Sequence, residues 1–379
     1  MKAGPRKVLH VISGLHRGGA ETQLCRILAM MDRRRFEPTV VALLPGGGVR
    51  ADLEALGVRV GCAGMRTAAH APWAMVRLAR LIRRLRPDVV QGWMYHGNVA
   101  ASLGAALARW HRPVLWNVRN SLHDLGTDKR STVALIHIGA WCSAGVTRII
   151  YNAHASAEQH EAIGYRCEGR SVIPNGYDCD IFRPVAAARD DVRRELGLPA
   201  CAPLVGLVGR YHGKKGHDVF LEAAAHTAAE RPDVHFVLAG RGVDHGNRRL
   251  VARMAVLGIT ARVHLLGERH DLRRLYSALD VLATASFNEG SPGVVGEAMA
   301  CGTPCVVTDV GDSARVVGDT GIVVPPRQPA ELARAWGKLL TMPLDDRAAL
   351  GHRARRHIEE HFSVASTARQ YEALYEGLQ

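Results

Sequence analysis

The chain has 379 residues, of which 47% are hydrophobic, and a formal net charge of +13. This length is large for one domain and sufficient for two domains that each bury a core. The composition is rich in Ala, Val, Leu and Gly and poor in aromatic residues, which is typical of parallel sheets covered by helices rather than of a disordered chain. Eight cysteines occur without a CxxC pair or metal-ligand spacing, which favours reduced core residues over a redox or zinc role.

Short apolar strands alternate with helical patterns along the first half. The expected strands cover residues 8–12, 39–44, 58–61, 89–92, 114–118 and 148–151. A second series restarts after the middle of the chain, at residues 203–209, 234–239, 262–266, 281–283, 305–308 and 321–324. This alternation predicts an α/β fold of two Rossmann-like domains, each with a parallel sheet that binds ligands beyond the carboxyl ends of its strands.

Two further segments connect or close this pattern. The sequence VIPNGYDCDIFRP at residues 172–184 reads as an ordered connector because of its Pro and Asn-Gly elements. Residues 364–378 have the pattern of an amphipathic helix.

The sequence EGSPGVVGEAMACGTPCVVTDVG at residues 289–311 places Glu289 and Glu297 on either side of an expected helix start. Pro292 suits a first helical turn, and Gly302 is expected to end the helix before the next strand. Unpaired first-turn amides and the positive end of the helix dipole bind phosphates and hydroxyl groups. The segment therefore favours a sugar-nucleotide site over two ordinary surface glutamates.

Two common phosphate motifs are missing. The first strand runs into Gly18 and Gly19, which allow a ligand close to a helix start, but the spacing is not GxGxxG and no acidic residue ends the second strand. The sequence GRYHGKKGH at residues 209–217 is not a P-loop either. These absences count against a dinucleotide-dependent dehydrogenase and a P-loop ATPase.

The segment at 289–311 resembles the signature of the GT4 group of retaining glycosyltransferases. Four further segments extend the resemblance: GGAE at 18–21, IPNGYD at 173–178, GLVGRYHGKKGH at 206–217 and VHLLGERHDLRRLYSALDVLATAS at 263–286. The resemblance implies the GT-B fold, in which two doubly wound Rossmann-like domains face each other across a cleft. Residues 1–176 would bind the acceptor and residues 177–360 the nucleotide sugar. Residues 361–379 would form a helix that crosses back to the first domain.

In the second domain the resemblance places Arg210 and Lys215, which follow Gly209, on the diphosphate, with Lys214 as a bystander. Glu297 would bind the ribose and Glu289 a hydroxyl of the transferred sugar. Backbone groups complete the expected donor site, around the sugar and phosphate at Gly290, Ser291, Pro292, Gly293 and Val294, and around the base at Leu266, Gly267 and Arg269. Ser291 and Gly293 depart from the Phe and Asn that are common in the family.

In the first domain the resemblance suggests His96 as a catalytic residue and Gly18 and Gly19 as donor contacts. Arg119 and Asn120 stand where the family usually has a histidine that meets the sugar, and an Asn there cannot act as a general base. His123, Asp124 and Lys129 are weaker candidates.

The implied function is transfer of a hexose from a nucleoside-diphosphate sugar, with UDP expected, to a glycan or polyprenyl or other lipid-linked acceptor, with retention of configuration. We expect no cofactor and no metal, since Asp190-Asp191 and Asp345-Asp346 lie in polar regions expected to be connections rather than beside a strand end. Cell-surface polysaccharide or glycolipid synthesis in a bacterium would use such an enzyme. Within the same fold, a sugar-nucleotide epimerase and a phosphorylase remain alternatives, although no pyridoxal-phosphate lysine motif is evident.

The arginine-rich runs at residues 77–86, 248–253 and 347–356 have helical periods. Each is either a solvated amphipathic helix or a face that docks on anionic lipid. The runs lack interleaved aromatics, so we expect no nucleic-acid partner, and a basic non-enzymatic adaptor for membranes or nucleic acid remains the alternative from another class. The apolar stretch at 132–146 is too short to span a bilayer and is expected to be a buried core helix. Residues 1–7 are basic but run straight into an expected strand, so we expect no signal peptide and a cytoplasmic protein, with peripheral contact to the inner face of the cytoplasmic membrane left open.

Overall fold

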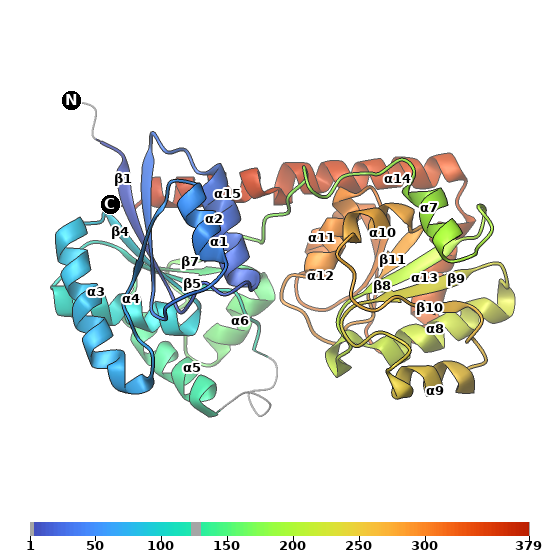
Figure 1. The fold of residues 1–379 in the computed structure, drawn as a ribbon, viewed down its shortest axis with the longest axis horizontal. Helices are drawn as coiled ribbons and strands as arrows, with labels where there is room; N and C mark the ends of the chain where they lie inside the picture. The colour runs from blue at the N-terminus through green and yellow to red at the C-terminus, as the bar shows by residue number, and fades with distance from the viewer. Residues whose placement is uncertain (1–3, 123–129, 379) are drawn as a thin grey trace. The chain divides into compact units, whose positions relative to one another are not determined.

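The computed structural model describes residues 4–122 and 130–378, which divide into two compact units. Unit 1 comprises the described residues of Met1–Gly176 and Val364–Gln379, and unit 2 comprises Tyr177–Ser363. Each unit is a parallel sheet between two layers of helices (Figure 1).

The sheet of unit 1 has seven strands in the order β3-β2-β1-β4-β5-β6-β7, all parallel. Its strands are β1 (Arg6–Ile12), β2 (Phe36–Ala42), β3 (Arg59–Cys62), β4 (Val89–Trp93), β5 (Val114–Val118), β6 (Arg148–Tyr151) and β7 (Arg170–Val172). Its helices are α1 (Gly19–Met30), α2 (Val49–Ala55), α3 (Ala71–Leu85), α4 (Met94–Ala108), α5 (Arg130–Cys142), α6 (His154–Ala162) and α15 (Val364–Glu376).

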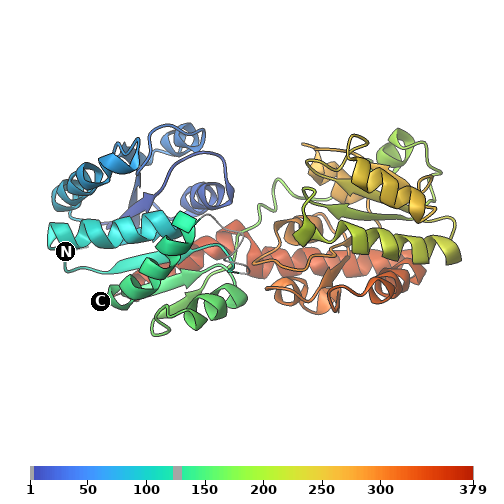
Figure 2. The same ribbon diagram turned by 90° about the horizontal axis from the view of Figure 1, so that it is seen from below.

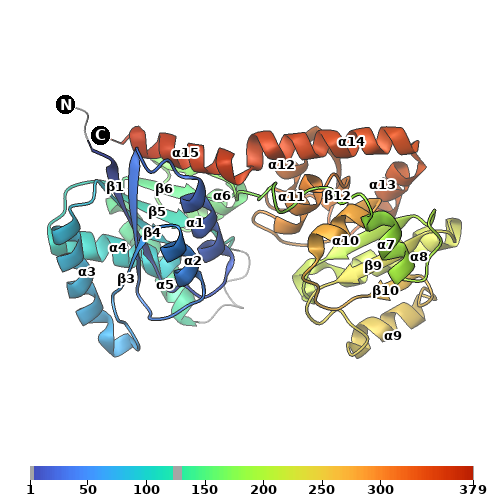
Figure 3. The same ribbon diagram turned by 45° about the horizontal axis from the view of Figure 1, so that its top comes forward.

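Alternating side chains of the unit 1 strands supply both faces of its sheet. Val8 and Ile12 pack under α1, α2 and α15, whereas Leu9 and Val11 pack under α3 and α4. The C-terminal helix α15 lies beside α1, at the opposite end of the sequence (Figure 3). Helices α3 and α4 lie side by side on the other face, in blue and cyan in Figure 2.

The sheet of unit 2 has six parallel strands in the order β10-β9-β8-β11-β12-β13. Its strands are β8 (Leu204–Val208), β9 (His235–Ala239), β10 (Val263–Leu265), β11 (Val281–Ala283), β12 (Cys305–Thr308) and β13 (Gly321–Val324). Its helices are α7 (Ala188–Glu195), α8 (His217–Glu230), α9 (Arg248–Val256), α10 (Leu272–Ala278), α11 (Gly293–Ala300), α12 (Ser313–Val317), α13 (Pro329–Thr341) and α14 (Leu344–His357).

A buried carboxylate ties the amino ends of two central strands of unit 2 to its helices. Asp280, just before β11, accepts hydrogen bonds from Arg193 at 2.7 Å, Arg347 at 3.0 Å and the Leu204 amide at 2.8 Å. Both Asp280 and Arg193 are almost fully buried. Since an unpaired buried charge costs several kcal/mol, this cluster fixes α7 and α14 on the sheet.

The structure corrects three expectations. The sheet of unit 1 has a seventh strand, β7, where the sequence predicted six, and only its last residue belongs to the segment interpreted as a connector. Helix α5 covers most of the apolar stretch at 132–146, but only Ile136 and Gly139 in it are buried, so it is a surface helix rather than a core helix. The two Asp pairs lie in the first turns of α7 and α14 and not in connections.

Candidate functional site

The loops that follow β8 and β11 meet in unit 2 where the strand order reverses. These strands are neighbours in the sheet, yet the chain leaves them toward opposite edges, which is where ligands bind in open α/β sheets. The Phe287 amide donates to the Lys214 carbonyl at 2.8 Å, which joins the two loops. Gly216 has φ +66° and a Cβ there would lie 1.9 Å from the Ala285 carbonyl oxygen, so only glycine permits this approach.

An ion pair bridges these two loops. Lys215 Nζ lies 2.5 Å from Glu289 Oε1, and Ser286 Oγ donates to the same oxygen at 2.8 Å. The Lys215 and Glu289 side chains keep 26% and 15% of their exposure, so the pair is accessible from outside. A cation and a carboxylate are thereby held next to each other at the point where the strand order of unit 2 reverses.

The two other cations of the same loop are arranged differently. For comparison, the aliphatic part of Lys215 packs beside Gly209, where a Cβ would lie 3.6 Å from Lys215 Cδ. Arg210 follows Gly209 directly and is exposed, with no ion pair to another described residue. Lys214 is also exposed, and only its backbone is engaged, through His212 Nδ1 and the Phe287 amide.

The helix α11 begins close to this pair. Pro292 is its N-cap, and the Gly293 and Val294 amides of the first turn have no acceptor within the helix. Glu297 lies in the second turn, where Tyr276 donates a hydrogen bond to Glu297 Oε2 at 3.1 Å. Burial of Tyr276, with the Glu297 charge next, raises the pKa of that phenol, so it stays a donor.

A tyrosine from the start of unit 2 supports the N-terminus of α11. The Tyr177 hydroxyl donates to the Pro292 carbonyl at 3.2 Å, and the ring fills the space beside Gly296, where a Cβ would lie 2.2 Å from it. Burial raises the pKa of Tyr177, whereas its hydrogen bond with Ser291 acts in the opposite direction. Tyr177 therefore holds the loop that carries Ser291 and Pro292 in place against α11.

The segment expected near a base is held by internal contacts. Leu266 donates to the Leu238 carbonyl at 2.9 Å, and Gly267 donates to the Val243 carbonyl at 2.8 Å. The Arg269 guanidinium is bound by Asp271, at 2.6–2.7 Å, and by Glu195, and these hydrogen bonds raise its pKa. The Arg269 side chain thus fixes the turn, and a base contact there would come from the backbone.

His217 is the first residue of α8, directly after the loop that carries Arg210, Lys214 and Lys215. It is buried, its ring lies 5.2 Å from that of Tyr211, and burial lowers its pKa to about 4. At neutral pH it adds no charge beside Lys215.

In unit 1 the strand order reverses between β1 and β4, and the candidate residues follow these two strands and the neighbouring β5. Gly18 is the N-cap of α1, and the Glu21 carboxylate folds back over it, within 2.6 Å of a Cβ built there. The next residue, Gly19, is exposed, and a Cβ on it would meet no described atom within 4 Å. The start of α1 is therefore open at Gly19 and partly covered by an acid at Gly18.

His96 lies in the first turn of α4, directly after β4. Its side chain is exposed, and partial desolvation lowers its pKa. Met94, the first residue of α4, has φ +61°, a left-handed conformation that a non-glycine residue rarely adopts. The strained turn sets where the helix starts and hence where His96 lies.

Arg119 and Asn120 follow β5 and differ in their contacts. The Arg119 guanidinium donates to the Tyr371 hydroxyl at 3.2 Å and to Asn175, and it lies 5.6 Å from the Trp93 ring centre. Burial lowers its pKa, and its contacts make it a link between β5, the segment before Gly176 and α15. Asn120 is exposed, and its carbonyl accepts from Ser156 at 2.6 Å.

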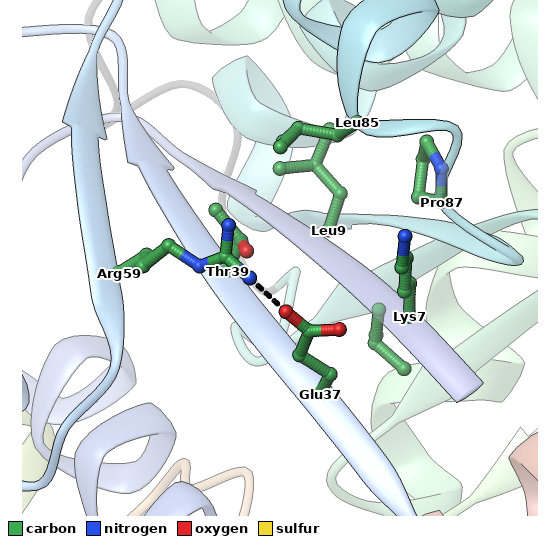
Figure 4. Close-up of a pocket in the computed structure, with 8 residues that line it drawn as sticks. Lys7, Leu9, Glu37, Thr39, Arg59, Leu85 and Pro87 are labelled. Carbon is green, nitrogen blue, oxygen red and sulfur yellow. Dashed lines mark hydrogen bonds and ion pairs between the residues drawn. The ribbon is translucent and has the colours of Figure 1, made fainter. Parts of the chain in front are cut away.

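Other features bear on ligands and membranes. Within residues 4–122 and 130–378, no group of three His, Cys, Asp or Glu side chains is placed to hold a metal ion, and no helix is long and apolar enough to cross a bilayer. His123, Asp124 and Lys129 lie outside the described residues. A cavity of about 30 Å³ lies at the amino ends of β1 and β2 and is too small for a nucleotide. Its lining includes Lys7 and Glu37, and Glu37 pairs with Arg59 (Figure 4).

Sequence reasoning missed the residues that position the candidates: Ser286 beside Glu289, Tyr276 beside Glu297 and Tyr177 beneath Pro292. Ser286 and Tyr276 lie inside a motif that the sequence had already singled out. Tyr177 lies inside IPNGYD at 173–178, which the sequence had also singled out, but its contact could not be inferred there because its partner is 115 residues away in sequence.

Two family models match the chain in tandem. Glycosyltransferase Family 4 matches residues 17–181, and Glycosyl transferases group 1 matches residues 202–342. A D-inositol 3-phosphate glycosyltransferase of Corynebacterium jeikeium is 36% identical over 219 residues, which are 55% of this chain and 51% of the relative, so the match spans about half the length of that relative. The putative glycosyltransferase EpsF of Bacillus subtilis is 26% identical over 324 residues, 82% of this chain and 80% of the relative.

The fold has solved counterparts. HepE of Anabaena, solved in complex with UDP, superposes with a TM-score of 0.82 over 98% of this chain and all of that one, at 22% identity. WaaG, a glycosyltransferase involved in lipopolysaccharide biosynthesis, superposes with a TM-score of 0.66 over 98% of this chain. The chain has the GT-B fold and belongs to the GT4 family of glycosyltransferases.

Proposed function

We propose that this protein transfers a hexose from a nucleoside-diphosphate sugar, with UDP as the nucleotide, to a glycan or lipid-linked acceptor. The observation that carries this proposal is the accessible Lys215–Glu289 pair beside the start of α11. A cation binds a diphosphate, a carboxylate accepts hydrogen bonds from sugar hydroxyls, and free helix amides can donate to either ligand. HepE has been solved in complex with UDP, with UDP and glucose, and with UDP-glucose, which supports this choice of donor.

The proposed roles divide between the units. Unit 2 binds the donor, with Lys215 and Arg210 on the diphosphate, Glu289 on a sugar hydroxyl and Glu297 on the ribose. Unit 1 binds the acceptor, with His96 near the reacting sugar. Because the Arg119 guanidinium is engaged internally, we propose that Asn120 rather than Arg119 takes the place of the family histidine.

The proposed reaction needs no metal and retains the anomeric configuration. The bond from the anomeric carbon to the phosphate oxygen breaks, the acceptor oxygen bonds to the same face of that carbon, and the acceptor proton passes to the leaving phosphate. Arg210, Lys215 and the α11 amides stabilise the charge that develops on the diphosphate. Loss of one preorganised donor of this kind typically slows such a step by about 100-fold or more.

Relatives and neighbours suggest a cellular setting. WaaG is a glycosyltransferase involved in lipopolysaccharide biosynthesis, and WaaB is a lipopolysaccharide outer core galactosyltransferase. We propose the same broad class of pathway for this protein, cell-surface polysaccharide or glycolipid synthesis, and a cytoplasmic location with peripheral contact to the inner membrane face.

The first experiment is a thermal-shift panel of UDP, GDP, ADP and their sugar conjugates, followed by an assay for acceptor-dependent release of UDP with and without a chelator. A ligand at about 100 times its Kd should stabilise the protein by about 2.7 kcal/mol. Lys215→Met should abolish most of the UDP shift, and the matched variant Lys214→Met should keep it. No nucleotide response would contradict the proposal, and interconversion of sugar nucleotides without an acceptor would favour an epimerase.

A further inference from the structure

Helices α3, α4 and α5 form one continuous layer on the sheet of unit 1, with α4 in the middle (Figure 1). We refer to them as the α3–α5 layer. The three helices contain no Asp or Glu, whereas α3 alone contains Arg77, Arg80, Arg83 and Arg84. This layer is therefore purely basic among the ionisable side chains that carry charge at neutral pH.

The same layer exposes large apolar side chains. Trp73 on α3 is 70% exposed and Trp141 on α5 is 84% exposed. Nearly half of the large exposed apolar side chains among the described residues lie here, the others in the layer being Val76, Leu103, Leu107 and Ile138. Several large apolar side chains exposed on one layer, two of them tryptophans, indicate a binding face rather than the scattered apolar residues of an ordinary surface.

The two other arginine-rich runs, on α9 and α14, differ because several of their arginines are neutralised internally. Arg253 pairs with Glu222, Arg347 with Asp280 and Arg355 with Glu359. In the α3 run no described acidic residue lies within ion-pair distance of Arg77, Arg80 or Arg84. The first run is therefore the one in which no arginine of the described residues is neutralised by an ion pair.

We propose that the α3–α5 layer docks on an anionic bilayer surface, an inference that rests on the membrane contact in the proposed function. Arginine guanidinium groups bind lipid phosphates, and tryptophan side chains lie at the depth of the headgroups, where one end of the indole is apolar and the other polar. The alternation of Trp73 and Val76 with Arg77 and Arg80 along α3 has the pattern of a helix that lies in an interface.

The layer matches lipid better than an acidic protein or a second copy. On α3 the exposed Trp73 and Val76 lie among four arginines, whereas the core of a stable protein interface has few charges. His96 lies in the first turn of α4, so docking of this layer would bring the proposed acceptor side of unit 1 to the lipid surface.

The test is flotation of the full chain with vesicles of phosphatidylglycerol and phosphatidylcholine in equal parts, against vesicles of phosphatidylcholine alone. The variant Arg77→Gln, Arg80→Gln, Arg84→Gln removes three exposed charges with little change in helix propensity. Its matched control, Arg248→Gln, Arg353→Gln, Arg356→Gln, removes three exposed charges from unit 2. Each basic residue near an anionic surface strengthens binding by about fivefold, so the first variant should bind roughly 100-fold more weakly and the control should bind like wild type.

A second variant separates the apolar part. Trp73→Ala with Trp141→Ala should weaken binding at high salt as much as at low salt, because screening acts on the charged part alone. The UDP-induced thermal shift should be unchanged in all of these variants.

Several results would overturn the inference. Equal flotation of wild type and the Arg77, Arg80, Arg84 variant would exclude this face, and failure of wild type to float would exclude membrane docking as well. Neither result affects the donor chemistry, which the UDP shift reports separately. If light scattering showed that wild type self-associates and this variant does not, with no binding to vesicles, the layer would be an interface between copies.

Discussion

Glu289→Gln separates nucleotide binding from sugar transfer. Glu289 Oε1 lies 2.5 Å from Lys215 Nζ, so in the proposed site the carboxylate competes with a diphosphate for this cation. The pair keeps part of its exposure, and its net contribution is about 1 kcal/mol. Freed from this competitor, Lys215 should bind UDP as tightly as in wild type or up to about fivefold more tightly.

The same substitution should impair transfer. A hydrogen bond to a carboxylate contributes about 1.5–3 kcal/mol, so its loss from the sugar should lower kcat/KM by roughly 10- to 150-fold. UDP affinity is measured by calorimetry and transfer by UDP release, with Glu230→Gln, an exposed glutamate at the end of α8, as the control. If Glu289→Gln weakened UDP itself as much as Lys215→Met does, the competition inferred from the ion pair would be wrong.

Four further outcomes follow from the geometry. Gly296→Ala should lower the free energy of unfolding by about 1–3 kcal/mol in urea titrations, because its Cβ would lie 2.2 Å from the Tyr177 ring; an unchanged midpoint would refute the contact. Asp280→Asn should cost about 3–5 kcal/mol by the same measurement, since buried arginines lose their counter-charge, and a loss under 1 kcal/mol would contradict this. Burial lowers the pKa of His217 from 6.5 to about 4, so the unfolded chain binds an extra proton there and this residue should remove about 1.4 kcal/mol of stability per pH unit as the pH drops between these values. His160 and His264, whose pKa values burial also lowers to about 4, add to the slope, so His217→Leu should reduce the slope by the His217 share alone, and an unchanged slope would contradict this. Gly293→Asn should leave the melting temperature nearly unchanged, because a Cβ there meets nothing within 4 Å, but should shift the relative kcat/KM among UDP-sugars; identical preferences would exclude Gly293 from the sugar site.

The sequence predicts the strand pattern well because parallel strands buried on both faces are short apolar runs. Each expected run in unit 2 corresponds to a strand, from β8 to β13. In unit 1 the short edge strand β7 was missed, since Arg170–Val172 has one apolar residue and no alternation to reveal it. Helix α5 shows the opposite limit: an apolar composition does not tell whether a helix is buried or exposed, and here it is exposed.

The candidate site is predictable in its members but not in their contacts. Glu289, Lys215 and Arg210 were singled out from local patterns, each within a few residues of a strand end. The Lys215–Glu289 pair spans 74 residues and depends on the close approach of two loops at Gly216, which no local pattern encodes. The internal partners of Arg119 come from the segment before Gly176 and from α15, so its structural role could not be read from the residues around it.

The residues around the start of α11 bear on how a sugar would be discriminated there. Family members commonly carry Phe and Asn where this chain has Ser291 and Gly293, and Gly293 is exposed with open space around it. Ser291 is further drawn toward Tyr177 by a hydrogen bond. At this rim the groups left to contact a sugar are therefore backbone amides and the Glu289 carboxylate. Amides and a carboxylate read the positions of hydroxyl groups but provide no wall against a ring substituent, so in the proposed site selection among hexoses would rest on hydrogen bonding rather than on steric exclusion.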